Sequence, residues 1–401
     1  AWAALLSTLP AIAVFLTVVA LPAAARRRLA VLILVAGAVS VVLGLVQMAQ
    51  GPNSPLRLFD VTNASVAVGF FANRNHFAAL LYTSLLLAAP FLIVGARRLL
   101  TEGPNGVVLL QFVGLCGLIV ALILGIAMAR SRAGVVLAMV AVFVIAGLSV
   151  LSLGHAGDGQ ERRAWWSSRR VVLGVLAFAL VFAAQGGLAG ILTRFERDPM
   201  EDLRVSLTST TLEAAWSNLP FGAGLGAFVP VFQMFEGGNA LTASYANRAH
   251  NDFAEFGLEM GIVGIVLMIL ALAWVIQRLW GAWRHPDPDL GPGDILLQRV
   301  AVIACLLLLA HSLVDYPLRT TAMSVVFAFC AGLLTRPTLD PRAARETFKS
   351  ANPHKVRRRT APSVEPSAIT PVPAGPPQSA WMDAIEWPET WQDGPDTRRK
   401  S

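Results

Sequence analysis

The sequence has little charge for its length. Only 14% of its 401 residues are charged, 55% are hydrophobic, and the mean hydropathy is +0.60. Soluble domains carry about 25% charged residues. This deficit excludes an ordinary soluble domain and predicts a protein that crosses a membrane several times.

Cysteine is also scarce, and neither the cysteines nor the net positive charge indicates a site. The three cysteines, Cys116, Cys305 and Cys330, lie inside apolar runs without CxxC spacing, so we expect small apolar core residues. The net charge of +7 does not indicate nucleic-acid binding, because most arginines lie in loops beside apolar runs.

Nine apolar runs are long enough, or nearly so, to cross a bilayer. A spanning helix needs about 20 mostly apolar residues. The runs predict an all-α polytopic membrane protein with about nine transmembrane helices. They lie near residues 3–21, 29–49, 76–95, 107–128, 133–153, 171–190, 257–280, 295–313 and 318–335.

Arginines in alternate loops predict the orientation, because cytoplasmic loops are enriched in Lys and Arg. They follow the first, third, fifth and seventh spans and recur in the C-terminal tail: Arg26, Arg27, Arg28, Arg97, Arg98, Arg162, Arg163, Arg169, Arg170, Arg278, Arg284, Arg336, Arg342, Arg345, Arg357, Arg358 and Arg359. The long polar loop 192–256 is then periplasmic. The same count places Ala1 outside, so we expect at least one further span before it.

The chain divides into two expected regions. Residues 1–336 form a polytopic membrane domain that includes the periplasmic loop 192–256. Residues 337–401 are rich in proline, serine and charge, and have too little apolar surface to fold alone. We expect them to form a disordered cytoplasmic tail.

Several cations break the orientation rule, because they lie outside and close to the membrane. Charge in such a place is a functional-site hypothesis, although snorkelling or loop capping is the alternative for any single residue. The set is Arg57, Arg74, His76, Arg130, Arg132, Arg194, Arg197, Arg204, Arg248, His250, His311 and Arg319. Arg binds phosphate oxygens with a planar fork. The set therefore suits an anionic substrate such as a lipid-linked pyrophosphate.

His250 and Asn251 lie where the long loop re-enters the membrane. Histidine is the side chain best suited to take a proton near neutral pH. Asp252, Glu255 and Glu259 follow on one face of a helix. They either orient His or Arg partners or form a wetted face at the membrane entry.

Two other motifs in the loop carry weaker signals. Asp198, Glu201 and Asp202 are the best metal candidates outside, but they lack the spacing of a defined cation loop, and we favour a charged helix N-terminus for them. Gly222, Gly224 and Gly226 do not follow a strand. They predict a sharp turn with close backbone approach rather than a nucleotide loop.

Taken in order, these motifs resemble the O-antigen ligase and Wzy-type polymerase superfamily of bacterial envelope proteins. The most specific match is His250-Asn251, a nine-residue gap, and Gly261-Ile262-Val263-Gly264. Supporting matches are Gly69–Ala78, Ser131–Gly134, Arg204 followed by Trp216, Pro220 and the three glycines, and His311–Pro317. The resemblance covers residues 30–335. The family usually has more than nine spans.

The resemblance implies a membrane-embedded glycosyltransferase of GT-C-like architecture in the bacterial inner membrane. It would move a glycan from undecaprenyl pyrophosphate to an acceptor hydroxyl on the periplasmic face. The reaction would invert the anomeric centre and need no metal or cofactor. His250 would be the base, and Arg204 and Arg132 would hold the departing pyrophosphate. Substrate contacts would come from Arg74, Arg194, Arg130, Asn251, His76, His311 and Arg319.

The acceptor stays open. We favour polymerisation of exopolysaccharide or O-antigen units, because nothing singles out a lipid A-core acceptor. The alternatives are an O-antigen ligase, transfer to protein or teichoic-type acceptors and, more distantly, a lipid-linked oligosaccharide transporter. A transporter needs ionisable groups deep in its spans. The spans carry almost none apart from Arg299, and their main polar residues are the uncharged Gln47, Gln111 and Gln185.

Overall fold

The computed structural model describes residues 2–59, 65–101, 105–151, 167–184, 199–236 and 246–338. Every regular element in these ranges is a helix, which confirms the all-α prediction. The described residues belong to one compact unit, Ala1–Ala343. The expected tail lies outside the described residues from residue 339 onward.

Nine apolar helical segments match the nine predicted spans. The first is divided into α1 (Trp2–Leu6) and α2 (Leu9–Val19); the others are α3 (Ala23–Gln50), α4 (Arg74–Thr101), α5 (Gly106–Ala129), α6 (Arg132–Leu151), the helix Ser167–Ala184, α10 (Asp252–Arg284), α11 (Pro292–His311) and α12 (Thr321–Leu333). Among the described residues, seven helices are long and apolar enough to cross a membrane, and the first and last segments are shorter. The prediction of a polytopic membrane protein is confirmed.

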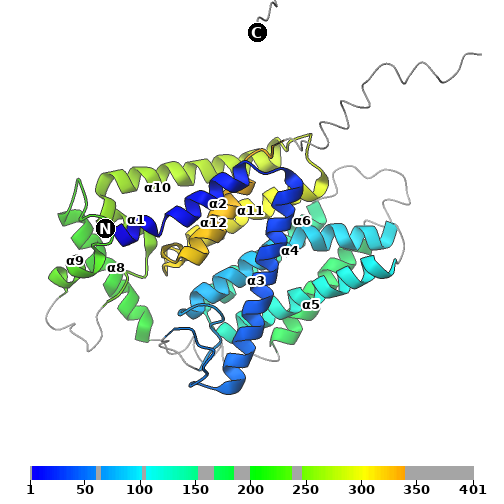
Figure 1. Cartoon of the computed structure of the whole chain (residues 1–401), viewed down its shortest axis with the longest axis horizontal. Helices are drawn as coiled ribbons and strands as arrows, with labels where there is room; N and C mark the ends of the chain where they lie inside the picture. Colours follow the sequence, from blue (N-terminus) through cyan, green and yellow to red (C-terminus); the bar gives the residue numbers. More distant parts are fainter. Residues whose placement is uncertain are drawn as a thin grey trace, which may run out of the picture. The chain divides into compact units, whose positions relative to one another are not determined.

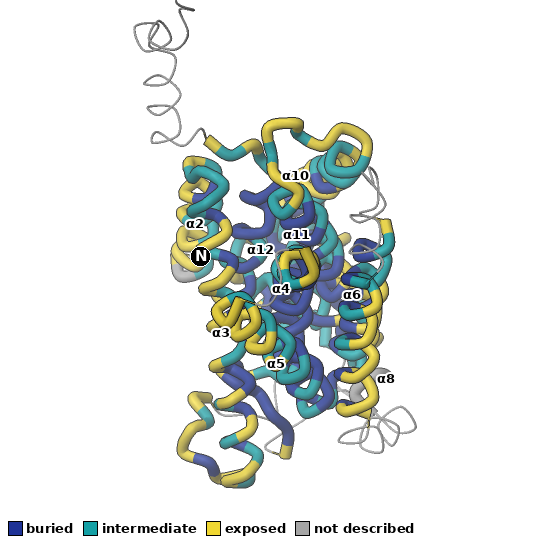
Figure 2. Tube along the Cα trace, turned by 90° about the vertical axis from the view of Figure 1, so that its right-hand side faces the viewer, coloured by how far each residue is buried: buried dark blue, intermediate teal, exposed yellow. Residues whose placement is uncertain are grey.

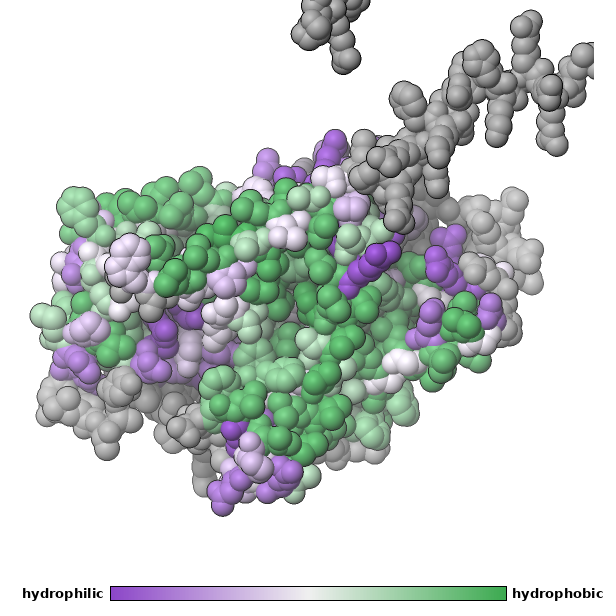
Figure 3. Space-filling model, in the orientation of Figure 1, coloured by the Kyte–Doolittle hydropathy of each residue, from purple (hydrophilic) through white to green (hydrophobic). Residues whose placement is uncertain are grey.

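Helix α4 is the core of the bundle. The apolar part of α4 is 89% buried, and α3, α5, α6, α11 and α12 all contact it (Figure 2). The surrounding helices keep exposed apolar side chains, which gives the largely apolar surface of Figure 3. A lipid-facing surface needs such apolar side chains. The polar residues at the start of α4, Asn75 and His76, are instead buried inside the bundle.

Helix α10 is interrupted at Gly261, and a glycine-rich loop packs into the break. Gly261 has φ 56 and ψ −141. The amide of Ile262 donates to Pro220 O (2.9 Å), and the amide of Gly224 donates to Glu259 O (2.9 Å). A Cβ at Gly261 would overlap Pro220 O, and one at Gly222 would overlap the backbone of Gly261. The predicted turn with close backbone approach is therefore confirmed.

Two helices outside the nine spans flank this loop. They are α8 (Pro199–Ser217) and α9 (Phe228–Phe235), and both contact α10. Figure 1 shows them at the left, beside the start of α10. Leu207 and Ala214 of α8, Phe228 and Phe232 of α9, and Leu258 of α10 form a small buried cluster. The described part of the long loop is thus folded onto the N-terminal part of α10.

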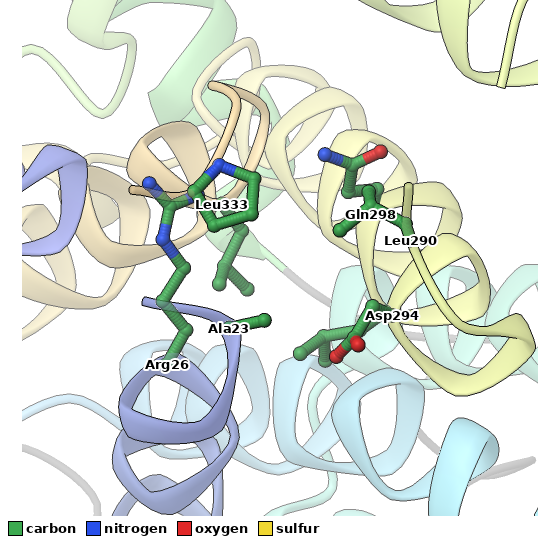
Figure 4. Close-up of a pocket in the computed structure, with 8 residues that line it drawn as sticks. Ala23, Arg26, Leu290, Asp294, Gln298 and Leu333 are labelled. Atoms are coloured by element: carbon green, nitrogen blue, oxygen red, sulfur yellow. The ribbon is translucent and has the colours of Figure 1, made fainter. Parts of the chain in front are cut away.

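Arg26, one of the arginines used to predict orientation, has a structural role. Its guanidinium is buried and donates to Val19 O (3.1 Å), Thr335 O (2.7 Å) and Arg336 O (3.1 Å). It therefore joins the end of α2 to the end of α12. A void of about 20 Å³, enough for one water molecule, lies beside it (Figure 4).

Gln47, the first of the polar residues expected inside the spans, anchors the loop between α3 and α4. Its side chain donates to Gly69 O (2.8 Å) and Leu56 O (3.0 Å) and accepts from the amide of Gly69 (3.0 Å). Gln111 is exposed and Gln185 lies outside the described residues. Arg299 donates to Ala282 O (3.1 Å) near the start of α11.

The cysteines pack as expected. Cys305 and Cys330 are buried, Cys116 is half-buried, and all three are free thiols within the apolar core.

Candidate functional site

The predicted site residues are carried by helix ends that meet at one end of the bundle. Helices α4, α6 and α10 begin there and α5 and α11 end there, since successive spans alternate in direction. The amide of Ala67, in the loop before α4, reaches the carbonyl of Met128 at the end of α5 (3.4 Å). His250, just before α10, reaches Asp315, just after α11. Residues far apart in the sequence therefore form one polar cluster.

His250 is held by a buried carboxylate. Its backbone is in the left-handed region (φ 53), and its Nδ1 lies 3.1 Å from Asp315 Oδ1. The second oxygen of Asp315 accepts hydrogen bonds from the side-chain amides of Asn73 and Asn75. The His250 side chain is 20% exposed, and among the described residues its Nε2 has no hydrogen-bond partner. A donor at Nδ1 leaves Nε2 as an accessible proton acceptor.

The Asp315 carboxyl is ionised despite being fully buried. Burial alone would raise its pKa, but the hydrogen bond from His250 holds the pKa below its usual range. A fixed negative charge at this place keeps the proton on Nδ1 of His250. It also stabilises the imidazolium that forms when Nε2 accepts a proton.

Tyr316 lies between two histidines. Its ring centroid is 4.9 Å from that of His250 and 4.8 Å from that of His76, with the rings nearly perpendicular. Burial and the nearby Asp315 carboxylate raise the pKa of the Tyr316 phenol. The neutral tyrosine therefore packs against both imidazoles and limits how far either can rotate.

His76 and His311 lie in the interior beneath His250, not at the surface. His76 is 2% exposed and His311 is 0% exposed. Nδ1 of His311 lies 3.1 Å from the hydroxyl of Tyr82. Within the described ranges, Nε2 of each histidine is buried without a hydrogen-bond partner, and the charge of Arg204 acts on His311. The cluster thus has two buried imidazole nitrogens that no described residue satisfies.

Three of the predicted arginines have a buried guanidinium nitrogen without a partner among the residues that the structure describes: Arg74 at the start of α4, Arg204 on α8, and Arg319. Arg130 ends α5 in a left-handed conformation (φ 47), and Arg132 begins α6. Arg194 and Asp198 lie outside the described residues, as do the side chains of the metal candidates Glu201 and Asp202.

The turn that carries Arg132 is fixed against α4. Ser131 Oγ accepts from the amide of Gly134 (3.0 Å), and a Cβ on Gly134 would meet Ala78. Ala78 lies two residues after His76. This close packing brings the starts of α4 and α6, and with them His76 and Arg132, to adjoining positions.

Two of the three acidic residues after His250 orient arginines, and Asp252 accepts hydrogen bonds from Ser312 Oγ (2.7 Å) and the amide of Leu318 (3.1 Å), so the alternative of a wetted face is wrong. Asp252, Glu255 and Glu259 are all buried. Glu255 pairs with Arg248 (2.7 Å), and Glu259 pairs with Arg319 (2.6 Å). Burial would lower the pKa of the Arg319 guanidinium, but Glu255 and Glu259 raise it. Because carboxylates already compensate Arg248 and Arg319, we leave both out of the candidate anion site.

Asn251 has a structural role. Its Oδ1 caps α10 by accepting from the amides of Phe253 (3.0 Å) and Ala254 (3.1 Å). Its Nδ2 donates to Leu313 O (3.1 Å). The residue therefore joins the start of α10 to the turn that carries Asp315, and its predicted contact with substrate stays a prediction.

A cavity of about 680 Å³ lies beside the acidic cluster. Its wall is mainly apolar and includes Phe253, Phe256 and Met268 of α10, Ala11 of α2 and Phe327 of α12. Arg248, Asp252, Glu259 and Arg319 lie at its polar part. Such a shape suits a hydrocarbon chain that carries a polar group.

Four residues of the site have no role predicted from the sequence, although all lie in the motifs quoted above: Asp315, Asn73, Asn75 and Tyr316. The sequence feature that could have indicated Asp315 is its position in the short outside turn between His311 and Arg319. Only the cations of that turn were considered as site residues. An acid in such a turn is a natural partner for a predicted catalytic histidine.

The fold and the cluster define a polytopic membrane protein with a buried histidine–carboxylate site where its spans meet the large loop. A family model described as O-antigen ligase matches residues 117–269, which run from α5 into α10 and include Arg132, Arg204 and His250. The match confirms the resemblance to the O-antigen ligase and Wzy-type superfamily. Over these residues the chain is similar to the O-antigen ligase family. No curated protein and no solved structure matches the chain.

Proposed function

We propose that the protein is a metal-independent, inverting glycosyltransferase. It takes a glycan from undecaprenyl pyrophosphate on the periplasmic face of the inner membrane and passes it to an acceptor hydroxyl. The observation that carries the proposal is the pair of His250 Nδ1 and buried Asp315 (3.1 Å), with Nε2 of His250 left accessible. The C-terminal tail is then cytoplasmic.

The transfer is a single displacement. His250 Nε2 takes the proton of the acceptor hydroxyl while its oxygen forms a bond to the anomeric carbon. The bond from that carbon to the pyrophosphate oxygen breaks, and its electron pair leaves with the pyrophosphate. Attack from the face opposite the leaving group inverts the anomeric configuration. Asp315 stabilises the imidazolium but does not touch the reacting atoms.

Arg204, Arg74 and Arg132 hold the charge of the leaving group. The buried nitrogens of Arg74 and Arg204 without partners among the described residues support this assignment, because buried donors need an acceptor. His76 and His311 would contribute their Nε2 atoms to the oxygens of the same substrate. Removing one such donor costs about a hundred- to a thousandfold in rate.

The apolar cavity supports a lipid-linked donor. Its volume of about 680 Å³ and its aromatic and aliphatic wall fit part of a polyprenyl chain. Its arginines are already paired with Glu255 and Glu259, so we place the pyrophosphate at Arg204 and Arg74 instead.

For the acceptor, we favour the growing end of an exopolysaccharide or O-antigen chain. Transfer to lipid A-core is the second candidate, because the matching family model is described as O-antigen ligase. The glycans of a deletion strain distinguish the two. Single unpolymerised repeats indicate a polymerase, and unattached full-length chains indicate a ligase. Lipid-linked substrate stalled on the cytoplasmic side would instead indicate a transporter.

The test of the chemistry is a set of variants assayed for glycan product in membranes. His250→Ala and Arg204→Ala are expected to remove most product. The matched controls are His285→Ala and Arg97→Ala, exposed residues away from the cluster, which should retain full activity. Undiminished product in well-expressed His250→Ala and Arg204→Ala would overturn the proposal.

A further inference from the structure

Helix α8 has two opposite apolar faces, only one of which is packed. Leu207, Thr211 and Ala214 form the buried face, and Leu207 and Ala214 pack in the cluster with Leu258 of α10. Val205, Leu212 and Trp216 lie on the other side of the helix and are 68%, 55% and 79% exposed. They recur at helical spacing and form a stripe. The stripe is uncovered within the described part of the chain.

The exposed stripe continues beyond the end of α8. Phe221, in the loop after α8, is 87% exposed, and Met234 of α9 is 81% exposed. We call Val205, Leu212, Trp216, Phe221 and Met234 the apolar stripe. All five lie outside the nine apolar spans. An exposed apolar surface of this kind marks an interaction surface, because isolated proteins in water rarely keep one.

The loop that carries Phe221 is fixed at a definite level along α10. It packs into the break at Gly261, where Ile262 donates to Pro220 O (2.9 Å). The exposed apolar face of α10 begins directly below this point. Its exposed members are Ile262, Val263, Ile265, Val266, Leu267, Ile269, Leu270 and Leu272. The stripe is therefore continuous with a surface that faces lipid.

The length of α10 indicates that Gly261, and the loop docked there, lie at the membrane surface. From Gly261 to Trp280 the helix rises about 29 Å at 1.5 Å per residue, close to the ~30 Å of the hydrocarbon core. Trp280 is 61% exposed and carries the guanidinium of Arg284 4.6 Å from its ring centroid. Trp and Arg are typical of the membrane–water boundary. If Trp280 marks one boundary, Gly261 and the docked loop lie at the other.

We propose that α8, the loop Leu219–Gly226 and α9 bind the outer surface of the bilayer through the apolar stripe. Trp216 and Phe221 enter the boundary between headgroups and acyl chains, where Trp is favoured because its ring is apolar and its N–H is polar. Continuity with the lipid-facing side of α10 identifies lipid as the occupant. Membrane binding by this surface stands independently of the proposed glycosyl transfer.

The anchor has one consequence that does rest on the proposed function. Arg204 directly precedes Val205 on α8. Binding of the stripe to the bilayer sets the height of Arg204 above the membrane. The guanidinium is then held near the headgroup level, where the pyrophosphate of a lipid-linked donor lies.

Depth-dependent fluorescence quenching tests the anchor. Trp216→Cys and Phe221→Cys are each made in the full chain with its three native cysteines replaced by alanine, and labelled with a polarity-sensitive dye. Each is placed at one copy per phosphatidylcholine nanodisc, with doxyl groups either near the headgroups or deep in the acyl chains. Ser206→Cys is the matched control, because Ser206 is exposed on the same helix away from the stripe.

Both stripe positions are expected to show blue-shifted emission and several-fold more quenching by shallow doxyl lipids than Ser206→Cys. Emission like that in water, or quenching no greater than the control, would overturn the proposal. Blue-shifted emission that doxyl lipids do not quench would also overturn it and would indicate a protein partner or another segment of this chain. The two positions are independent, so failure of one variant to fold leaves the other as the test.

Catalytic variants separate this proposal from the proposed function. His250→Ala should lose activity and keep the quenching pattern. The double variant Trp216→Ser/Phe221→Ser should lower product formation in membranes several-fold. Full activity of the double variant with normal quenching at Met234→Cys would show that the stripe does not position Arg204.

Discussion

At the scale of single residues, the pairing of His250 with Asp315 decides what the site can do. An exposed histidine on a loop is a weak and poorly oriented base. Here a buried carboxylate fixes Nδ1 at 3.1 Å, two asparagines fix the carboxylate, and Tyr316 packs against the imidazole ring. The histidine therefore has one defined tautomer and one accessible nitrogen.

Asp315→Asn tests this pairing. The amide keeps the size of the side chain but loses the negative charge that holds the proton on Nδ1 of His250. We expect the transfer rate to fall by about a hundred- to ten-thousandfold, as when the acid of a catalytic triad is replaced by its amide. The measurement is initial rate with saturating lipid-linked glycan. Asp289→Asn is the control, because Asp289 lies in the loop between α10 and α11. Equal rates for the wild type and Asp315→Asn would exclude the role given to Asp315.

The lowered pKa of Asp315 also predicts how stability depends on pH. Because the pKa is depressed in the folded protein, ionised Asp315 contributes stability at every pH above its unfolded value of about 3.9. This contribution is lost as pH falls below that value toward the folded pKa. The melting-temperature gap between wild type and Asp315→Asn in detergent should not narrow between neutral pH and about pH 4, and it should narrow below pH 4. A gap that closes between pH 7 and pH 5 would contradict the assignment.

At the scale of elements, the break in α10 explains the Gly-x-x-Gly pattern after His250. Gly261 supplies a conformation with φ 56 and the space into which Pro220 O fits. The part of α10 before the break carries the acidic residues, and His250 lies just ahead of it. The break thus couples the position of the long loop to the position of the base.

Gly261→Ala tests this coupling. A side chain at this position would clash with Pro220 O and would need an unfavourable backbone conformation, which alone costs about 1–3 kcal/mol. We expect a lower melting temperature and faster proteolysis within α8 and α9. Gly257→Ala is the matched control in the same helix, where a Cβ meets nothing within 4 Å and a neutral or stabilising effect is expected. Equal effects of the two substitutions would refute the docking of the loop.

The sequence predicted the spans far better than the folded part of the loop. All nine spans have a helical counterpart, because long apolar runs are a strong and local signal. The start of helix α8 agrees with the charged helix N-terminus expected near Asp198, but the extent of the helix was not predicted, since its apolar residues are divided between two faces and show no single stripe. Asp315 was missed for another reason: its partner His250 lies 65 residues away, and only the folded chain brings the two together.

At the scale of the whole molecule, arginines of the same predicted cytoplasmic loop have different structural roles. Arg26, Arg27 and Arg28 all count toward orientation, yet only Arg26 is buried and joins α2 to α12. The site at the opposite end of the bundle depends on α12, because the turn that carries Asp315 and Arg319 leads into it. The Arg26 contacts therefore support the site from a distance.

Arg26→Ala is expected to destabilise the protein by about 1–3 kcal/mol, because it leaves several part-buried carbonyl groups without their donor. Arg28→Ala, at an exposed position in the same run, should have little effect. Thermal unfolding in detergent measures both. Equal melting temperatures for the two variants would show that Arg26 acts only as an orientation signal.

The most direct test of the whole account is single-turnover transfer by purified protein from undecaprenyl-pyrophosphate-linked glycan to its acceptor. For His250→Ala we expect a rate at least about a hundredfold below wild type, with binding of the lipid-linked donor retained. A His250→Ala protein that transfers glycan at the wild-type rate would contradict it.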